Sequence, residues 1–138
     1  MLICDIKEGK YVRAADNCIL CELLHPQNLR GQVSMNYSLS HAIVPAGETT
    51  LPHRLKTSSE VYYILSGEGV MYIEDETSEV RPGQVVYIPP GSVQYIKNTG
   101  QDDLIFLAIV DPVWRSEDED VLVSDDQDTG ESCKKGSE

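Results

Sequence analysis

The sequence lacks the apolar run of roughly 18 residues or more that a membrane-spanning helix needs. Basic residues are also few, since 11 lysines and arginines stand against 23 acids and give a formal net charge of −12. Nucleic acids and membrane surfaces attract clustered Lys and Arg, so neither is an expected partner. The N-terminal MLICDIKEGK lacks the basic and apolar stretches of a secretory signal, which predicts a cytoplasmic location.

Cysteine is scarce, with four residues, and no disulfide framework is indicated. Cys4, Cys18, Cys21 and His25 have two interpretations. They are a Cys3His zinc set, or the thiols are simply buried. We favour buried thiols for Cys18 and Cys21, because the Ile-Leu pair between them suits a strand better than a zinc knuckle, and on a strand the two would face opposite sides. Cys133 is expected to be a free, exposed thiol.

The acidic charge is concentrated at the C-terminal end. Residues 116–138 hold nine acids and two lysines, which is −7 of the total charge of −12. The part after about Val123 has few large apolar residues to bury, so we expect a solvated and largely disordered tail. Three segments follow from this: an N-terminal arm with the first strands (1–34), a barrel domain (35–115) and an acidic tail (116–138). Residues Val121, Leu122 and Val123 offer apolar contacts that would hold the first part of the tail against the domain.

The body of the chain predicts an all-β fold. Short runs rich in Val, Ile, Tyr and Leu alternate with turn signals such as Arg81-Pro-Gly83, and the body shows no sustained helical period. The expected strands are Tyr37–Val44, Val61–Leu65, Val70–Glu74, Val85–Ile88, Val93–Lys97 and Leu104–Val110. This spacing is typical of a sandwich or barrel rather than of βαβ units.

Two of these strands are apolar on both faces. In 104–110 and in 61–65 both alternating sets of side chains are hydrophobic, whereas a half-solvated strand alternates with polar residues. One face must fill the barrel, so the other needs a second cover. The N-terminal segment or a second subunit can supply it, and we predict a homodimer formed partly through this outer face.

Two segments anchored by glycine carry the functional information. The first reads GETTLPHRLKTSSEVYYILSG from Gly47 to Gly67, and the second reads GQVVYIPPGSVQYIKN from Gly83 to Asn98. His53 and Leu55 are two apart on an extended stretch and so face the same side.

This spacing resembles the two motifs of the cupin superfamily. The matching positions are Gly47, His53, Glu60, Gly67, Gly83, Pro89, Gly91 and Asn98, with 15 residues between the segments. The resemblance covers most of residues 18–122 and implies a small single-domain cupin barrel, of the jelly-roll or double-stranded β-helix type. It implies fold more strongly than function, because this barrel carries many activities.

The family's usual metal shell holds three histidines and one glutamate, and here the site is degenerate. Leu55 and Gln94 occupy the second and third histidine positions. Leucine is no ligand, and glutamine is a poor one for Fe, Mn, Ni or Zn. The resemblance therefore implies at most a weakly bound divalent metal on His53, Glu60 and Gln94, and no bound metal is the other reading.

Without a metal, a His–Glu pair in an apolar cavity suits proton transfer next to a carbonyl. The candidate catalytic residues are His53 and Glu60. Burial of Glu60 is expected to raise the pKa of its carboxyl. The predicted ligand pocket comprises Leu55, Tyr62, Ile64, Gln94, Ile96 and His41.

The sequence leaves three functions open. The preferred one is a small-molecule-binding cupin that takes a sugar or carboxylate, with isomerase-like or epimerase-like proton transfer. The second is a metal-dependent oxygenase or decarboxylase, and the third is a non-catalytic accessory protein acting through its tail and outer sheet. Arg54 and Lys56 alternate away from His53, toward the rim or solvent.

Overall fold

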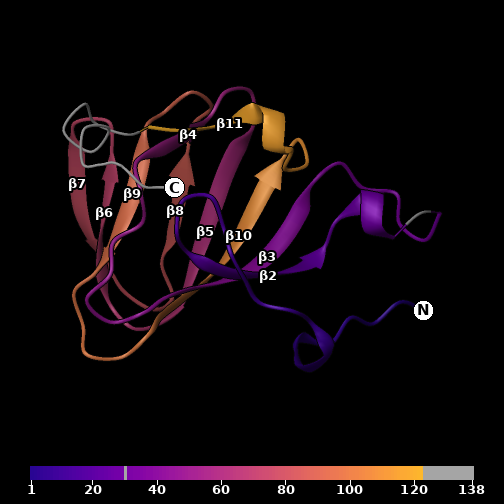
Figure 1. The fold of residues 1–138 in the computed structure, drawn as a ribbon, viewed down its shortest axis with the longest axis horizontal. Helices are drawn as coiled ribbons and strands as arrows, with labels where there is room; N and C mark the ends of the chain where they lie inside the picture. The colour runs from indigo at the N-terminus through magenta and orange to yellow at the C-terminus, as the bar shows by residue number, and fades with distance from the viewer. Residues whose placement is uncertain (30, 123–138) are drawn as a thin grey trace, which may run out of the picture.

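The computed structural model describes residues 1–29 and 31–122, which fold almost entirely into β-structure. Two antiparallel sheets face each other, one with strand order β1-β2-β3-β10-β5-β8 and one with strand order β11-β4-β9-β6-β7 (Figure 1). The strands are β1 (Val12–Arg13), β2 (Ile19–Leu24), β3 (Ser38–Val44), β4 (His53–Leu55), β5 (Ser59–Ser66), β6 (Gly69–Ile73), β7 (Glu76–Val80), β8 (Val85–Ile88), β9 (Gln94–Asn98), β10 (Leu104–Asp111) and β11 (Glu119–Val121). Short 3-10 turns occupy η1 (Ile6–Glu8), η2 (Pro26–Asn28) and η3 (Ser116–Asp118).

All six strands predicted from the sequence are present, within one or two residues at each end. The prediction of an all-β barrel is therefore confirmed. Four short strands, β1, β4, β7 and β11, were not expected as strands. β7 reads Glu-Thr-Ser-Glu-Val and is exposed except at Val80, so it has no apolar period to reveal it. It pairs with β6 across a turn in which Glu74 has a φ of 53°, in the left-handed region.

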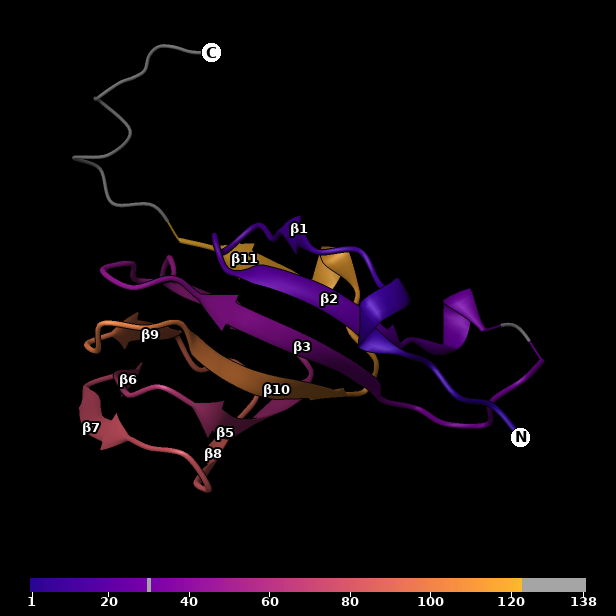
Figure 2. The ribbon, with the colours of Figure 1, turned by 90° about the horizontal axis from the view of Figure 1, so that it is seen from below.

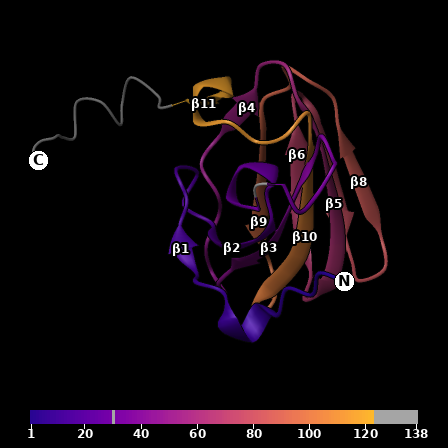
Figure 3. The same ribbon diagram turned by 90° about the vertical axis from the view of Figure 1, so that its right-hand side faces the viewer.

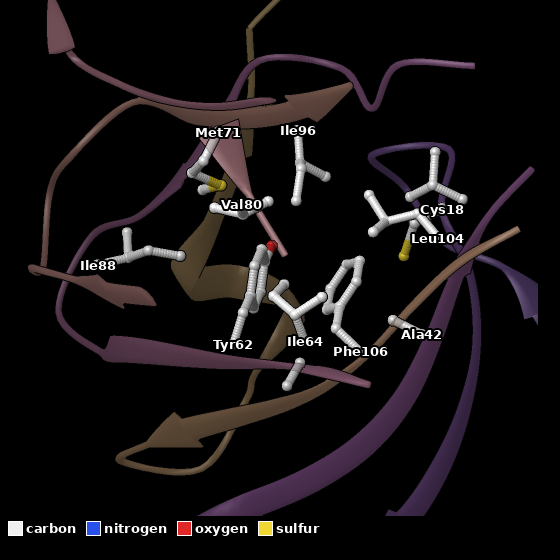
Figure 4. Packing of buried hydrophobic residues seen from close by; sticks show 12 residues of the cluster. Cys18, Ala42, Tyr62, Ile64, Met71, Val80, Ile88, Ile96, Leu104 and Phe106 are labelled. Atoms are coloured by element: carbon white, nitrogen blue, oxygen red, sulfur yellow. The ribbon is translucent and has the colours of Figure 1, made fainter. Parts of the chain in front are cut away.

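Strand β10 is the centre of the larger sheet, because it pairs with β3 on one side and β5 on the other. Its inward set, Leu104, Phe106, Ala108 and Val110, is buried, and the alternate apolar set is half-buried. Leu104, Phe106 and Ala108 belong to a core of 12 buried residues that both sheets share, and Val110 lines the cavity described below. In Figure 4 the rings of Tyr62 and Phe106 lie side by side, 4.3 Å between centroids. Burial of both faces of β10 is what its continuous apolar sequence predicts.

The N-terminal arm covers part of the outer face of the larger sheet. The Tyr11 hydroxyl lies 2.9 Å from His41 Nδ1, and Gly9 lies so close to Cys21 that an added Cβ would come within 2.3 Å of its sulfur. The far end of the same face stays uncovered, where Val85 and Tyr87 on the edge strand β8 are 62% and 59% exposed. The arm thus covers β2 and β3, whereas the predicted cover concerned the strands 61–65 and 104–110. On β5 the outward Tyr63 and Leu65 remain exposed, as does the outer face of β8.

The first part of the predicted acidic tail belongs to the barrel. β11 pairs with β4 and extends the smaller sheet, as Figure 3 shows. Asp118 secures this connection: it is 3% exposed and accepts hydrogen bonds from both the N–H and the hydroxyl of Thr57 and from the N–H of Ser58. Burial acts to raise the pKa of Asp118, but these bonds and nearby Arg115 outweigh it and lower the pKa. The tail expected from residue 116 therefore cannot begin before 122. Its later part, with Cys133, lies outside the described residues.

Figure 2 shows β1, β2 and β11 on the same side of the molecule. The loop between β1 and β2 therefore lies near β11, and these two segments form one wall of the site. Within residues 1–29 and 31–122, no helix has the length and apolar character required to cross a bilayer.

Candidate functional site

A cavity of about 620 Å³ opens between the two sheets. Its volume lies within the range typical of small-molecule sites. Its apolar wall includes Leu55, Tyr62, Phe106, Val110 and Trp114. The charged lining is mainly acidic, with Asp16, Glu22, Glu60 and Glu119, against Lys10 and His53.

His53 begins β4 and points into this cavity. The side chain is buried, and its Nδ1 lies 2.7 Å from the carbonyl oxygen of Leu51, which can only accept a hydrogen bond. Nδ1 therefore carries a proton, and Nε2 is the nitrogen turned to the cavity. Nε2 lies 3.4 Å from Oδ2 of Asp16.

Three side chains of the predicted site form a hydrogen-bonded chain. The Tyr62 hydroxyl donates to Gln94 Oε1 at 2.9 Å, and Gln94 Nε2 donates to Glu60 Oε1 at 2.8 Å. The sheets hold this arrangement, because Glu60 and Tyr62 share one face of β5 while Gln94 starts β9 opposite His53. Glu60 lines the cavity at the end of the chain, and Gln94 lies behind it, outside the cavity lining.

The ionisation of Glu60 is strongly perturbed. Burial raises the pKa of its carboxyl to about 7, against the opposing influence of His53 and of the Gln94 hydrogen bond, while Asp16 and Glu119 raise it further. Burial likewise raises the pKa of Tyr62. The carboxyl of Glu119 also has a raised pKa, because it is partly buried and lies near Asp16, although His53 and Trp114 act against this. Acidic groups are thus crowded at one end of the cavity.

Two members of the site were not found by sequence reasoning. Asp16 lies in the turn between β1 and β2, and Glu119 begins β11, yet both bring a carboxylate oxygen close to the ring of His53. The three ligand atoms all lie within 4.8 Å of one another. Glu119 sits in a run of four acids, and nothing in that run distinguishes it from its solvated neighbours.

Apart from Gln94, the predicted pocket residues divide into three groups. Leu55 and Tyr62 line the cavity. Ile64 and Ile96 are fully buried in the hydrophobic core, so they support the wall without contacting the cavity. His41 was wrongly included: it lies on the opposite face of β3 from Ser40 and Ala42, which line the cavity, and it contacts Tyr11 outside.

The residues present do not fit the metal shell that the two sequence motifs implied. Gln94 accepts from Tyr62 at its amide oxygen and donates to Glu60 from its amide nitrogen, so its one potential ligand atom is engaged by Tyr62 rather than by a metal beside His53. Leu55 adds hydrocarbon where a ligand would be needed. The expectation of a weak metal on His53, Glu60 and Gln94 therefore has no support in this geometry.

The cysteines do not gather into a zinc set either. Cys18 lines the cavity, where burial and Asp16 raise the pKa of its thiol, while Cys21 is buried on the other face under Gly9. Cys4 is exposed, and His25 hydrogen-bonds the carbonyl of Trp114 at 2.9 Å. The three thiols are free, and Cys18 and Cys21 face opposite sides as strand alternation predicts.

Arg54 and Lys56 alternate away from His53, as expected. Both face Asp120 on β11, at 3.2 Å and 4.0 Å, with nearly half of each side chain exposed. Neither belongs to the cavity lining, so neither supplies positive charge to a bound ligand.

Residues 40–110 match the family model of the cupin domain. The chain belongs to the cupin family. This cupin is 42% identical over 107 residues to the uncharacterized protein MJ1618 of Methanocaldococcus jannaschii, an alignment that covers 78% of this chain and 83% of the relative. It is also 42% identical over 62 residues to the glucose-6-phosphate isomerase of Pyrococcus abyssi, which covers 41% of this chain and 33% of the isomerase. The chain thus spans only about a third of that enzyme's length.

The barrel also resembles solved structures. The crystal structure of a predicted oxalate decarboxylase from Thermotoga maritima superposes with a TM-score of 0.70 and 24% identity, over 80% of this chain and 99% of the other. At this identity the likeness shows the fold alone. The particular chemistry of this cupin must therefore be read from its own side chains.

Proposed function

We propose that this cupin binds an uncharged, sugar-like molecule in the barrel cavity and transfers a proton on it through Glu60. The observation that carries the proposal is a buried carboxyl, 9% exposed, which faces a cavity of ligand size and ends the chain from Tyr62 through Gln94. Buried ionisable groups that face a cavity are candidates for acid–base work.

The charge of the lining favours an uncharged ligand over an anionic one. Four acids face the cavity, and Lys10 is the one lysine or arginine among the described lining residues. Charges in a partly desolvated site interact strongly, so a carboxylate or phosphate placed near Glu60 and Glu119 would be repelled. Of the two ligand classes expected from the sequence, the structure therefore supports the sugar better than the carboxylate. Hydroxyl groups would find acceptors in the acids and packing surface on Tyr62, Phe106 and Trp114.

We assign the proton transfer to Glu60 rather than to His53. One nitrogen of His53 is committed to the Leu51 carbonyl, and the other faces Asp16 rather than open space. Glu60, in contrast, has one oxygen fixed by Gln94, and no hydrogen bond from the described residues occupies its Oε2. A carboxyl with a pKa of about 7 exchanges protons readily near neutral pH.

The reaction that this arrangement suits is isomerisation or epimerisation. The Glu60 carboxylate would take the proton from the carbon next to a ligand carbonyl while the carbonyl oxygen takes one from water, which gives an enediol, protonated Glu60 and hydroxide. Glu60 then returns its proton to the neighbouring carbon on the same face while the enediol hydroxyl on its own carbon gives its proton to the hydroxide, which yields the isomer; delivery of the carbon proton from water to the opposite face of the first carbon, with proton loss from its enediol oxygen and from Glu60, yields the epimer. The Gln94 amide holds the carboxyl in one orientation during both steps.

Deuterium exchange tests this proposal without knowledge of the natural substrate. Neutral aldoses and ketoses are screened for binding by thermal shift, and those that bind are incubated in D2O and followed by NMR. The wild type should introduce deuterium next to the carbonyl, and Glu60→Gln should bind the same sugars but lose at least about 100-fold in exchange rate. The exposed Glu76→Gln is the matched control and should behave as the wild type. Exchange that is equal in Glu60→Gln and the wild type would refute the role of Glu60.

A further inference from the structure

Three segments that lie far apart in the sequence converge beside the cavity. Asp16 comes from the turn before β2, His53 from the start of β4 and Glu119 from the start of β11. Asp16 is 7% exposed and His53 is 3% exposed. Among the described residues this is the one group of three or more potential metal ligands, and only His53 belongs to the two sequence motifs.

The nitrogen at the centre of this group has no hydrogen-bond partner within residues 1–29 and 31–122. Nδ1 of His53 donates to the Leu51 carbonyl, and a ring that carries this proton alone presents a lone pair at Nε2. That lone pair faces carboxylate oxygens of Asp16 and Glu119, which are also acceptors. Three acceptors turned toward one another in a buried place repel unless a positive species lies between them.

The spacing suits a metal ion better than a proton. A proton shared between imidazolium and carboxylate draws the two atoms to about 2.7–2.9 Å. The distance from Nε2 to Asp16 Oδ2 is 3.4 Å. Two ligand atoms that are each about 2.1 Å from a tetrahedral ion lie about 3.4 Å apart. Within residues 1–29 and 31–122, neither Asp16 nor Glu119 forms an ion pair with a lysine or arginine.

We propose that Asp16, His53 and Glu119 bind one divalent metal ion of the Zn²⁺ or Mn²⁺ class at the wall of the cavity. One imidazole nitrogen and two carboxylate oxygens suit these ions, and the hydrogen bond to Leu51 orients the imidazole as a partner behind a ligand does. Three protein ligands leave at least one position open to water or ligand on the cavity side.

This site differs in position and in ligands from the shell that the motifs implied. Leu55 and Gln94 remove two nitrogen ligands, while Asp16 and Glu119 bring two carboxylates from outside the motifs. Glu60 is not part of the set, because it is held by Gln94. The metal site therefore does not depend on proton transfer by Glu60, and each proposal can fail without the other.

Titration of the metal-free full chain with Zn²⁺ and with Mn²⁺ tests the site. The protein is stripped with a chelator, and binding is measured by calorimetry in excess Mg²⁺, which saturates weak sites on the acidic surface. We expect one strong site per chain, with affinity reduced at least about tenfold in Asp16→Asn and in Glu119→Gln. Asp120→Asn, at a surface acid next to Glu119, is the control and should bind as the wild type does.

A spectroscopic readout on the unaltered protein guards against variants that fail to fold. Co²⁺ in the stripped wild type should give the intense visible absorption of a tetrahedral site, and added Zn²⁺ should remove it. The inference is overturned if no stoichiometric site appears. It is also overturned if affinity depends on Glu60 or Gln94 but not on Asp16 and Glu119. NMR that finds the His53 ring doubly protonated in the stripped protein and unchanged by Zn²⁺ would likewise overturn it.

Discussion

Replacing Glu60 with glutamine should change how the stability of this cupin depends on pH. The carboxyl is buried, and burial is the main cause that raises its pKa from 4.5 to about 7. The folded protein therefore holds a proton on Glu60 across a window in which the unfolded chain has released it. Between about pH 4.5 and pH 7 the free energy of unfolding contributed by this group falls as the pH rises.

The size of the effect follows from the width of that window. A shift from 4.5 to about 7 corresponds to about 3 kcal/mol, fully present as a destabilisation above pH 7 and absent below about pH 4.5. Glutamine has the same shape, carries no charge and keeps an oxygen to accept from Gln94. Glu60→Gln should therefore match the wild type at pH 4.5 and exceed its unfolding free energy by up to about 3 kcal/mol at pH 8.

Urea denaturation of both proteins across pH 4.5 to 8 is the assay, with a chelator present so that bound metal does not vary. Titrating groups that do not interact with Glu60, such as Asp118 with its lowered pKa, contribute equally to both curves and cancel in the difference. Glu76→Gln makes the same chemical change at an exposed position of β7 and should give a difference that does not depend on pH. A constant difference between Glu60→Gln and the wild type would show that Glu60 does not titrate in this window.

Three further predictions concern the frame and its surface. Gly67 has a φ of +85° and no room for a Cβ, so Gly67→Ala should lower the free energy of unfolding, measured in urea, by more than about 1 kcal/mol. Gly31 also has a positive φ but has open space around it, so Gly31→Ala should lower the free energy of unfolding less. Equal losses in the two variants would contradict the packing argument. Asp118→Ala leaves the buried N–H of Ser58 without its partner and should lower the free energy of unfolding by about 2 kcal/mol, whereas an unchanged urea midpoint would refute this. We also propose a homodimer through the uncovered β8 face, so sedimentation should find dimers that Tyr87→Lys weakens, and a wild-type monomer at all concentrations would exclude it.

The frame was predictable because it depends on local patterns. Alternating apolar residues mark a strand wherever one face is buried, and the glycine-rich turns separate the strands along the chain. Gly47, Gly67, Gly83 and Gly91 all have positive φ, so the motif glycines mark turns that other residues adopt with strain. The short polar strands escaped prediction because their pairing is decided by neighbours rather than by their own sequence.

The site was predictable only where it lies on the motifs. His53, Glu60 and Gln94 were expected to be close, and the structure brings Glu60 and Gln94 into a hydrogen bond. Asp16 and Glu119 lie 37 and 66 residues from His53 in the sequence, in segments without a distinguishing pattern. Asp16 and Glu119 come together only in the folded barrel, where the turn between β1 and β2 and strand β11 both lie near His53.

The two departures from the family pattern have a common physical consequence. Gln94 can satisfy both Tyr62 and Glu60 at once because an amide donates and accepts, whereas a neutral imidazole in its place would offer one of each in a different geometry. With Leu55 in place of a second histidine, Glu60 gains no further cationic neighbour, and burial raises the pKa of its carboxyl to about 7. A metal ion bound directly to Glu60 would hold the carboxylate ionised and abolish this property. Leu55 and Gln94 therefore favour proton transfer at Glu60. The proposed metal ion instead binds the carboxylates of Asp16 and Glu119, which the turn before β2 and strand β11 place near His53.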